Sequence, residues 1–118
     1  MFRFLIMFSA GLCLCLSAVL MFAPGAYVGL YLDGAAPGGA FMGRRAAPVL
    51  FGVAIIVFTL RDVPAGTHRR TVALAMAAMW GGIGLTGLWE NGVGQANANA
   101  MIAALFELML AVAFVRAR

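Results

Sequence analysis

The chain opens on a long uncharged segment, Phe4-Leu-Ile-Met-Phe-Ser-Ala-Gly-Leu-Cys-Leu-Cys-Leu-Ser-Ala-Val-Leu-Met-Phe-Ala23. A helix needs about 20 mostly apolar residues to cross a bilayer, and this segment supplies them. Three further apolar runs follow: Ala46 to Leu60, Thr71 to Trp89, and a run from about Asn97 to Val115 that holds one charge, Glu107. Because lipid forbids unpaired backbone groups, we expect each run to cross the membrane as a helix.

The composition agrees with a chain covered by lipid. Of its 118 residues, 64% are hydrophobic and 10% are charged, whereas a soluble domain is about half apolar and a quarter charged. The mean hydropathy is +1.02. These values exclude a soluble enzyme, a secreted disulfide-rich domain and a disordered tail. The net charge of +4 comes from eight arginines and four acids spread along the chain, which indicates membrane topology and no nucleic-acid partner.

We therefore predict an all-α membrane protein, a single domain over residues 1–118 with four transmembrane helices in an antiparallel bundle. The expected helices cover about residues 4–24, 42–61, 70–89 and 97–116. The apolar connection after the first helix is either an interfacial helix over residues 25–33 or an extension of the first helix kinked at Pro24. Tyr27 and Tyr31 share a face there if the connection is helical, and tyrosine is typical of the lipid–water boundary.

The distribution of arginine favours a cytoplasmic location for both termini. The first run resembles a secretory signal, but it is long and another span follows it, so we expect it to be retained. With the N-terminus inside, six arginines lie on the inner side and two, Arg44 and Arg45, lie outside. His68 falls in the short inner connection, where we expect a solvated loop residue. We expect no metal site and no cofactor.

Smaller features predict local structure. Cys13 and Cys15 are two residues apart on a helix, so they point to different faces, cannot bridge each other and are expected to pack. Asn97 or Asn99 is expected to cap the last helix.

Residues 29–34 (GLYLDG) resemble residues 87–92 (GLWENG), which suggests two repeated helical hairpins. If the repeat is real, the first helix should extend towards Leu32.

Glu107 is the strongest candidate for chemistry, because a carboxylate in mid-bilayer is costly and is a functional candidate by default. It shares a seam of small residues with Ala104 and Ala111, so it should face protein rather than lipid. One interpretation is a proton- or cation-responsive site. The other is a protonated side chain that hydrogen-bonds across a helix interface. Glu90, at the outer boundary, is the easier partner for the Arg44–Arg45 pair.

Arg44 and Arg45 lie just before Pro48 and form a second candidate site, for a lipid phosphate or another anion. The alternative is that both arginines snorkel at a helix end. A helix that starts at Pro48 spans only about 20 Å before Arg61. Either this helix begins near Phe41 and kinks at Pro48, or the bilayer is thin there.

Small residues suggest where helices pack. The candidates for close helix packing lie in the third and fourth runs: Ala77, Gly81, Gly82, Gly84, Ala104 and Ala111. More small faces are present than one four-helix bundle requires, and a homo-oligomer or docking on a larger membrane complex is one interpretation of the excess. The alternatives are packing within the chain and a water-accessible cavity around Trp80 and Glu107.

The motifs Gly43-Arg44-Arg45-Ala-Ala-Pro48, Leu60-Arg61-Asp62 and Phe22-Ala-Pro24-Gly resemble those of small four-helix bacterial inner-membrane proteins of unknown function, the DUF4345-like group. The resemblance implies four helices in a bacterial inner membrane and assigns no catalytic residues. We expect a protein without enzymatic activity, an accessory or structural subunit that packs on itself or on other membrane subunits and binds lipid. The alternative is a small proton-coupled transporter or channel that uses Glu107.

Overall fold

The computed structural model describes residues 1–33 and 37–118, and every regular element in them is helical. Four long helices are present: α1 (Phe2–Phe22), α3 (Pro37–Thr59), α4 (Thr67–Gly92) and α5 (Ala98–Arg116). A short helix, α2 (Pro24–Tyr31), follows α1, and a single 3₁₀ turn, η1 (Leu60–Asp62), follows α3. The prediction of an all-α chain with four helices long and apolar enough to span a membrane is confirmed.

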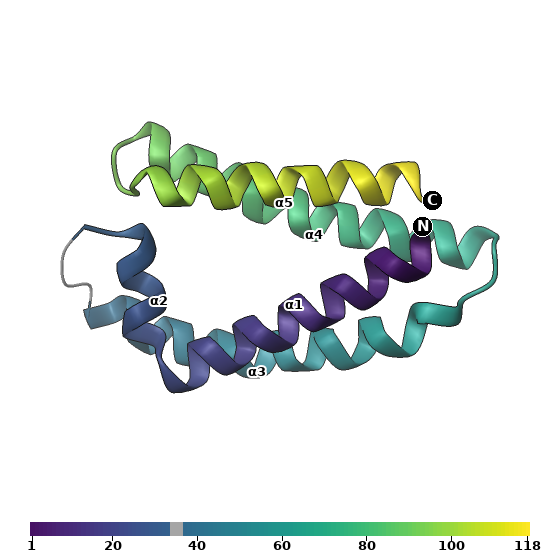
Figure 1. Cartoon of the computed structure of the whole chain (residues 1–118), viewed down its shortest axis with the longest axis horizontal. Helices are drawn as coiled ribbons and strands as arrows, with labels where there is room; N and C mark the ends of the chain where they lie inside the picture. Colours follow the sequence, from purple (N-terminus) through teal and green to yellow (C-terminus); the bar gives the residue numbers. More distant parts are fainter. Residues whose placement is uncertain (34–36) are drawn as a thin grey trace.

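The break between α1 and α2 falls at Ala23 and Pro24. A residue that precedes proline is driven out of the helical region, and Ala23 has φ −136° and ψ 50°. Pro24 then begins α2, where a missing N–H costs nothing. Figure 1 shows α2 turning away from the line of α1. The expected extension of the first helix towards Leu32 is therefore wrong, and Gly34, the end of the first repeat motif, lies outside the described residues.

Pro48 lies inside α3 rather than at its start. The helix begins at Pro37, earlier than the expected start near residue 42, and the apolar span Gly38–Asp62 covers 25 residues. At 1.5 Å per residue this is about 37 Å, enough for a hydrocarbon core of about 30 Å. Because α3 continues through Pro48, it is long enough to cross the hydrocarbon core. The Arg44 carbonyl then lacks its helical hydrogen bond, since proline has no backbone N–H to donate.

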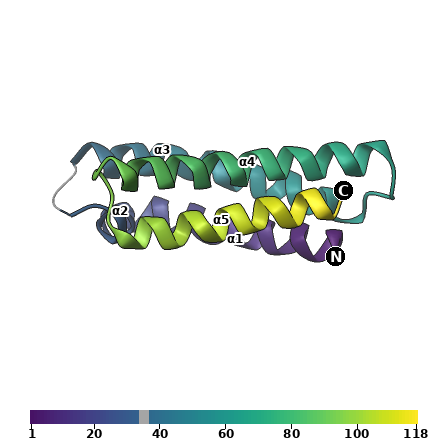
Figure 2. The same cartoon turned by 90° about the horizontal axis from the view of Figure 1, so that it is seen from above.

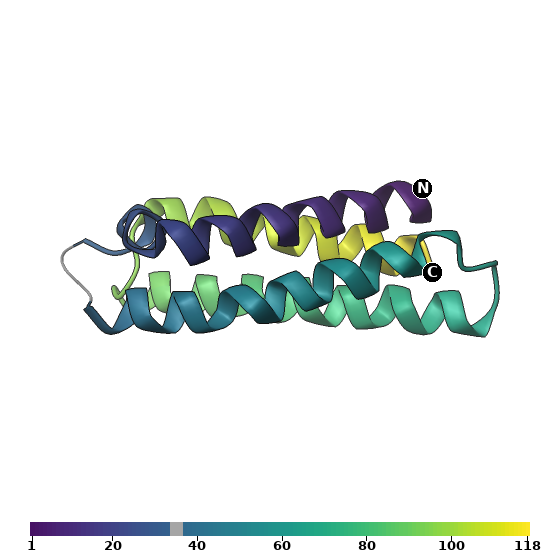
Figure 3. The ribbon, with the colours of Figure 1, turned by 90° about the horizontal axis from the view of Figure 1, so that it is seen from below.

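The long helices associate as two pairs. In Figure 1, α1 lies beside α3 and α4 lies beside α5, and the pairs are closest at the end that carries both termini. Figures 2 and 3 show that α2 lies at the opposite end, next to the start of α5. The molecule extends 47 × 28 × 16 Å, so its long axis is close to the thickness of a bilayer with its headgroups, about 40–45 Å.

Bulky side chains join the two pairs where they meet. The largest fully buried side chains include Trp80 of α4, Phe2 and Ile6 of α1, and Phe114 of α5. Inside this core the Trp80 indole Nε1–H donates to the Ser9 hydroxyl at 3.1 Å. The α1–α3 pair has its own buried hydrogen bond, from the Ser17 hydroxyl to the Ala47 carbonyl at 2.7 Å.

Candidate functional site

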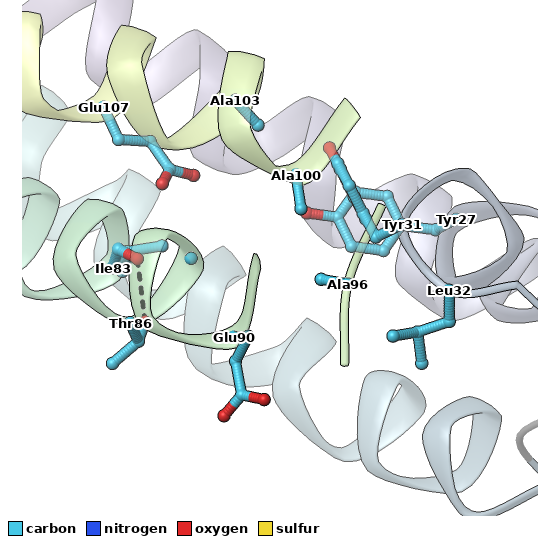
Figure 4. A pocket seen from close by; sticks show the side chains of 11 residues that line it. Tyr27, Tyr31, Leu32, Ile83, Thr86, Glu90, Ala96, Ala100, Ala103 and Glu107 are labelled. Atoms are coloured by element: carbon cyan, nitrogen blue, oxygen red, sulfur yellow. Dashed lines mark hydrogen bonds between the residues drawn. The ribbon is translucent and has the colours of Figure 1, made fainter. Parts of the chain in front are cut away.

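Glu107 is half-buried on α5, and its carboxylate points across towards α4 (Figure 4). It lines a cavity of about 420 Å³ between α2, α4 and α5, within the range of about 300–1,000 Å³ typical of small-molecule sites. We call this space the carboxylate cavity, because both glutamates of the chain line it. Its lining residues are Tyr27, Tyr31, Leu32, Ile83, Thr86, Gly87, Glu90, Ala96, Ala100, Ala103 and Glu107.

Helical spacing explains why these side chains meet. On α5, Ala100, Ala103 and Glu107 are three and four residues apart and share one face. Thr86 and Glu90 share a face of α4 in the same way. The small alanines of α5 leave space opposite α4, and the Glu107 side chain enters that space. Glu107 thus lines a space between helices of its own chain and is half-buried there.

Tyr27 and Tyr31 form the aromatic wall of the cavity. They are four residues apart on α2, and their rings meet edge to face with centroids 5.0 Å apart. Burial raises the pKa of the Tyr27 phenol, and the neighbouring Tyr31 and the negative charge of Glu107 raise it further. Tyr27 therefore keeps its proton at neutral pH and presents a neutral hydroxyl to the cavity.

Asparagines at the start of α5 hold this aromatic wall in place. The backbone N–H of Asn97 donates to the Tyr31 carbonyl at 2.8 Å, and the side-chain amides of Asn97 and Asn99 each donate to the Leu30 carbonyl at 3.0 Å. The Asn97 side chain also accepts from the Asn99 backbone N–H, so the predicted N-cap is confirmed at Asn97. One residue thus both begins α5 and fastens α2 over the cavity.

Neither glutamate is neutralised by a cation. In the described part of the chain, the ion pairs join Arg3 and Arg61 to Asp62, with N–O distances of 3.2 and 3.3 Å, and neither glutamate takes part in one. Glu90 is exposed and lies near the end of α4, whereas Glu107 is half-buried near the level of Ile83. The seven residues from Ile83 to Glu90 correspond to about 10 Å of helix rise. The cavity therefore has a half-buried carboxylate, Glu107, and an exposed one, Glu90, at different levels along α4.

Arg44 and Arg45 are exposed on α3 and do not line the carboxylate cavity. The Arg45 guanidinium lies over the Phe41 ring, 5.7 Å from its centroid. The expected ion pair with Glu90 is absent among the described residues, because Glu90 belongs to the other helix pair. Both guanidiniums remain available to an anion from outside the chain.

The predicted packing residues divide between the interior and the surface. Ala77 and Ala104 are buried, and a Cβ on Gly84 would lie 2.9 Å from the Ala104 carbonyl oxygen. A Cβ on Gly81 would lie 3.5 Å from the Ala111 side chain. Gly82 is exposed, and a Cβ there would meet nothing within 4 Å. Most of the small seam is thus occupied within the α4–α5 pair, and Gly82 is the member that faces outward.

The remaining candidates do not join the cavity. Cys13 is buried, Cys15 is exposed, and neither forms a disulfide. His68 is exposed. No group of three or more histidine, cysteine or acidic side chains placed to hold a metal occurs within the described ranges. Trp80, which one sequence interpretation placed beside Glu107 in a cavity, lies in the core and does not line it.

Sequence reasoning missed two arrangements. The spacing of Tyr27 and Tyr31 was visible, but their position at the cavity that Glu107 also lines depends on the asparagine contacts between α5 and α2. In the sequence analysis Arg69 served only as one of the six arginines that indicate the cytoplasmic side. Its guanidinium lies over the Phe2 ring, 4.5 Å from the centroid, and its Nε is buried without a hydrogen-bond partner. The sequence signal for this contact was weak, because the two residues are far apart in the chain.

Comparisons with protein-family models, curated proteins and solved structures return no match to this chain. Its function is therefore inferred from its own residues, and the likeness to the DUF4345-like group stays a proposal.

Proposed function

We propose that the chain is an integral protein of a bacterial inner membrane that crosses the bilayer four times as an antiparallel bundle. Four sufficiently long apolar helices and a long axis of 47 Å support this placement. Both termini lie at the same end of the molecule (Figure 1), as an even number of crossings requires. The excess of arginine at that end supports a cytoplasmic location for the termini.

Within that membrane the chain acts as a non-enzymatic accessory or structural subunit. The observation that carries this role is an apolar groove of about 460 Å³ on the outward face of the α1–α3 pair. Ala10, Gly11 and Ala54 line it, and a Cβ on Gly11 would meet nothing within 4 Å. Small residues let another helix or an acyl chain approach closely. A lipid phosphate near Arg44 and Arg45 would complement such an acyl chain.

The position of the groove changes the docking face expected from the sequence. That face was assigned to the small residues of α4 and α5, but most of these pack against each other inside the chain. Gly82 alone of the predicted set is left open. The α1–α3 groove is therefore the better candidate surface for a partner subunit or a second copy.

Purification from the native membrane in a mild detergent, followed by native mass spectrometry, tests the subunit role. We expect a complex with a second subunit, or a homo-oligomer, that retains lipid. Gly11→Leu should release the partner because it fills the groove. Gly82→Leu, on another exposed helix face, is the matched control and should leave the complex intact. A lipid-free monomer as the sole species of the unmodified chain contradicts the proposal.

A small proton-coupled transporter or channel is the second candidate. It is favoured by the carboxylate cavity, because Glu107 lies deep in a space that opens between helices. Proton flux into liposomes that contain the purified chain tests this role, with Glu107→Gln as the comparison. The candidate predicts flux that the substitution abolishes. Equal flux from both proteins, or no flux from either, eliminates it.

A further inference from the structure

We propose that the carboxylate cavity binds a hydrophobic monovalent organic cation, with its charge against Glu107 and its apolar groups against Tyr27 and Tyr31. This inference rests on the membrane placement proposed above and goes beyond the subunit role. It concerns binding, and it stands whether or not transport follows. Three observations on the cavity carry it.

The first observation is the charge of the cavity. Its ionisable lining groups are Glu107, Glu90 and the two tyrosines, and no arginine or histidine lines it. Within residues 1–33 and 37–118, neither glutamate forms an ion pair. A carboxylate that is half-buried beside apolar walls, as Glu107 is, attracts a cation more strongly than a fully exposed one, because the surroundings screen it less. An anionic ligand would meet two acids and no compensating positive charge.

The second observation is the aromatic wall. The rings of Tyr27 and Tyr31 meet edge to face at one side of the cavity, and the bonds from Asn97 to the Tyr31 and Leu30 carbonyls hold α2 there. The face of an aromatic ring attracts cations, and organic cations bind between such rings and carboxylates. The tyrosine wall also supplies apolar contact area that a bare metal ion or a proton would leave unused.

The third observation is the size and composition of the space. A volume of about 420 Å³ exceeds what an inorganic cation needs and suits a small organic molecule. Leu32, Ile83 and the alanines of α5 make the remaining walls apolar, and Thr86 cannot add a free donor because its hydroxyl donates to the Ile83 carbonyl at 2.7 Å. An organic cation whose charge is surrounded by apolar groups is complementary to these walls.

The two glutamates lie at different depths, which assigns them different roles. Exposed Glu90 attracts the cation at the outer boundary, and half-buried Glu107 holds it inside. Because about 10 Å of helix separates the two levels, one bound charge contacts Glu107 alone. Loss of Glu107 should therefore weaken binding far more than loss of Glu90.

Binding of tetraphenylphosphonium to the purified full-length chain in nanodiscs tests the proposal, with empty nanodiscs subtracted. Tetraphenylborate, which has the same shape and the opposite charge, is the matched probe. We expect saturable binding of the phosphonium only. Glu107→Gln should weaken it about tenfold or more, as expected for loss of a charge-assisted contact. Asp62→Asn removes a carboxylate at the opposite end of the molecule and should leave binding unchanged.

A second variant keeps the test decisive if Glu107→Gln does not fold. Ala103→Phe keeps both carboxylates and fills the cavity, so it should also abolish binding while the protein elutes as a single species. Equal binding of the two probes, or unchanged binding in a folded Glu107→Gln or Ala103→Phe protein, overturns the inference. The native mass spectrometry experiment tests the subunit role separately. If the cation binds but the liposomes show no proton flux, only the transporter hypothesis is eliminated and the binding proposal stands.

Discussion

One hydroxyl satisfies the indole N–H at the centre of the core. The Ser9 hydroxyl accepts from Trp80 Nε1 at 3.1 Å, and both side chains are buried, with relative exposures of 0% and 2%. No water reaches this position, so the indole needs a partner within the protein. At the scale of single residues, this contact links the two helix pairs more specifically than the surrounding apolar side chains do.

Ser9→Ala leaves the Trp80 indole N–H without its partner. We expect the free energy of unfolding to fall by about 1 kcal/mol, the magnitude typical of hydrogen bonds between membrane helices. Unfolding by SDS titration in mixed micelles measures the change. In a double-mutant cycle, Trp80→Phe should add less to Ser9→Ala than it costs in the unmodified chain. Full additivity would show that the contact contributes nothing.

The α4–α5 pair depends on close backbone approach at the scale of helices. A Cβ on Gly84 would lie 2.9 Å from both the Ala104 carbonyl oxygen and Leu108 Cγ. The carbonyl belongs to the α5 backbone and cannot move aside by rotating a bond. Leu108 therefore faces α4 at this position.

Gly84→Ala should force α4 and α5 apart and cost about 1–3 kcal/mol, as overpacking does in protein cores. Gly82→Ala is the matched control, because a Cβ there meets nothing within 4 Å. It should leave stability unchanged or raise it by up to about 1 kcal/mol through helix propensity. SDS titration of both variants separates the two effects. A similar result for Gly84→Ala and Gly82→Ala contradicts the close packing.

Asn97 couples the start of α5 to α2. Asn97→Ala removes the N-cap and the side-chain hydrogen bond to Leu30, so we expect a loss of about 1 kcal/mol. Amide hydrogen exchange over residues 24–31 should accelerate, while exchange in α1 should not change. Asn91→Ala serves as the control, because the Asn91 side-chain amide donates to the Ala96 and Asn97 carbonyls and, among the described residues, makes no hydrogen bond to α2. Unchanged exchange of α2 in Asn97→Ala would contradict the coupling.

The orientation in the membrane is a property of the whole molecule. In a background with both native cysteines replaced by alanine, Gly94→Cys should react with a membrane-impermeant thiol reagent added outside spheroplasts. Gly66→Cys lies in the connection at the opposite end and should react only after the membrane is opened. If Gly66→Cys reacts from outside and Gly94→Cys does not, the proposed topology is wrong and both termini lie outside the cytoplasm.

Particular residues show how far sequence reasoning reached. The class and the number of long helices followed from hydropathy and length, because hydrocarbon imposes strong local constraints on a chain. The break at Pro24 was one of two alternatives and was settled by the backbone of Ala23. The continuation of α3 through Pro48 was likewise one of two alternatives, and it was settled by the structure, in which the helix runs from Pro37 to Thr59 with Pro48 inside it.

The sequence by itself determined that this chain forms four long apolar helices and that one of them carries an acidic residue, because those properties depend on short-range composition. Only the tertiary structure decided that Glu107 shares a cavity with Glu90 and with Tyr27 and Tyr31. It also decided that the α4 and α5 small residues pack on each other, apart from Gly82. The reason is that both outcomes depend on contacts between distant segments, such as Asn97 with Tyr31, that no local pattern encodes.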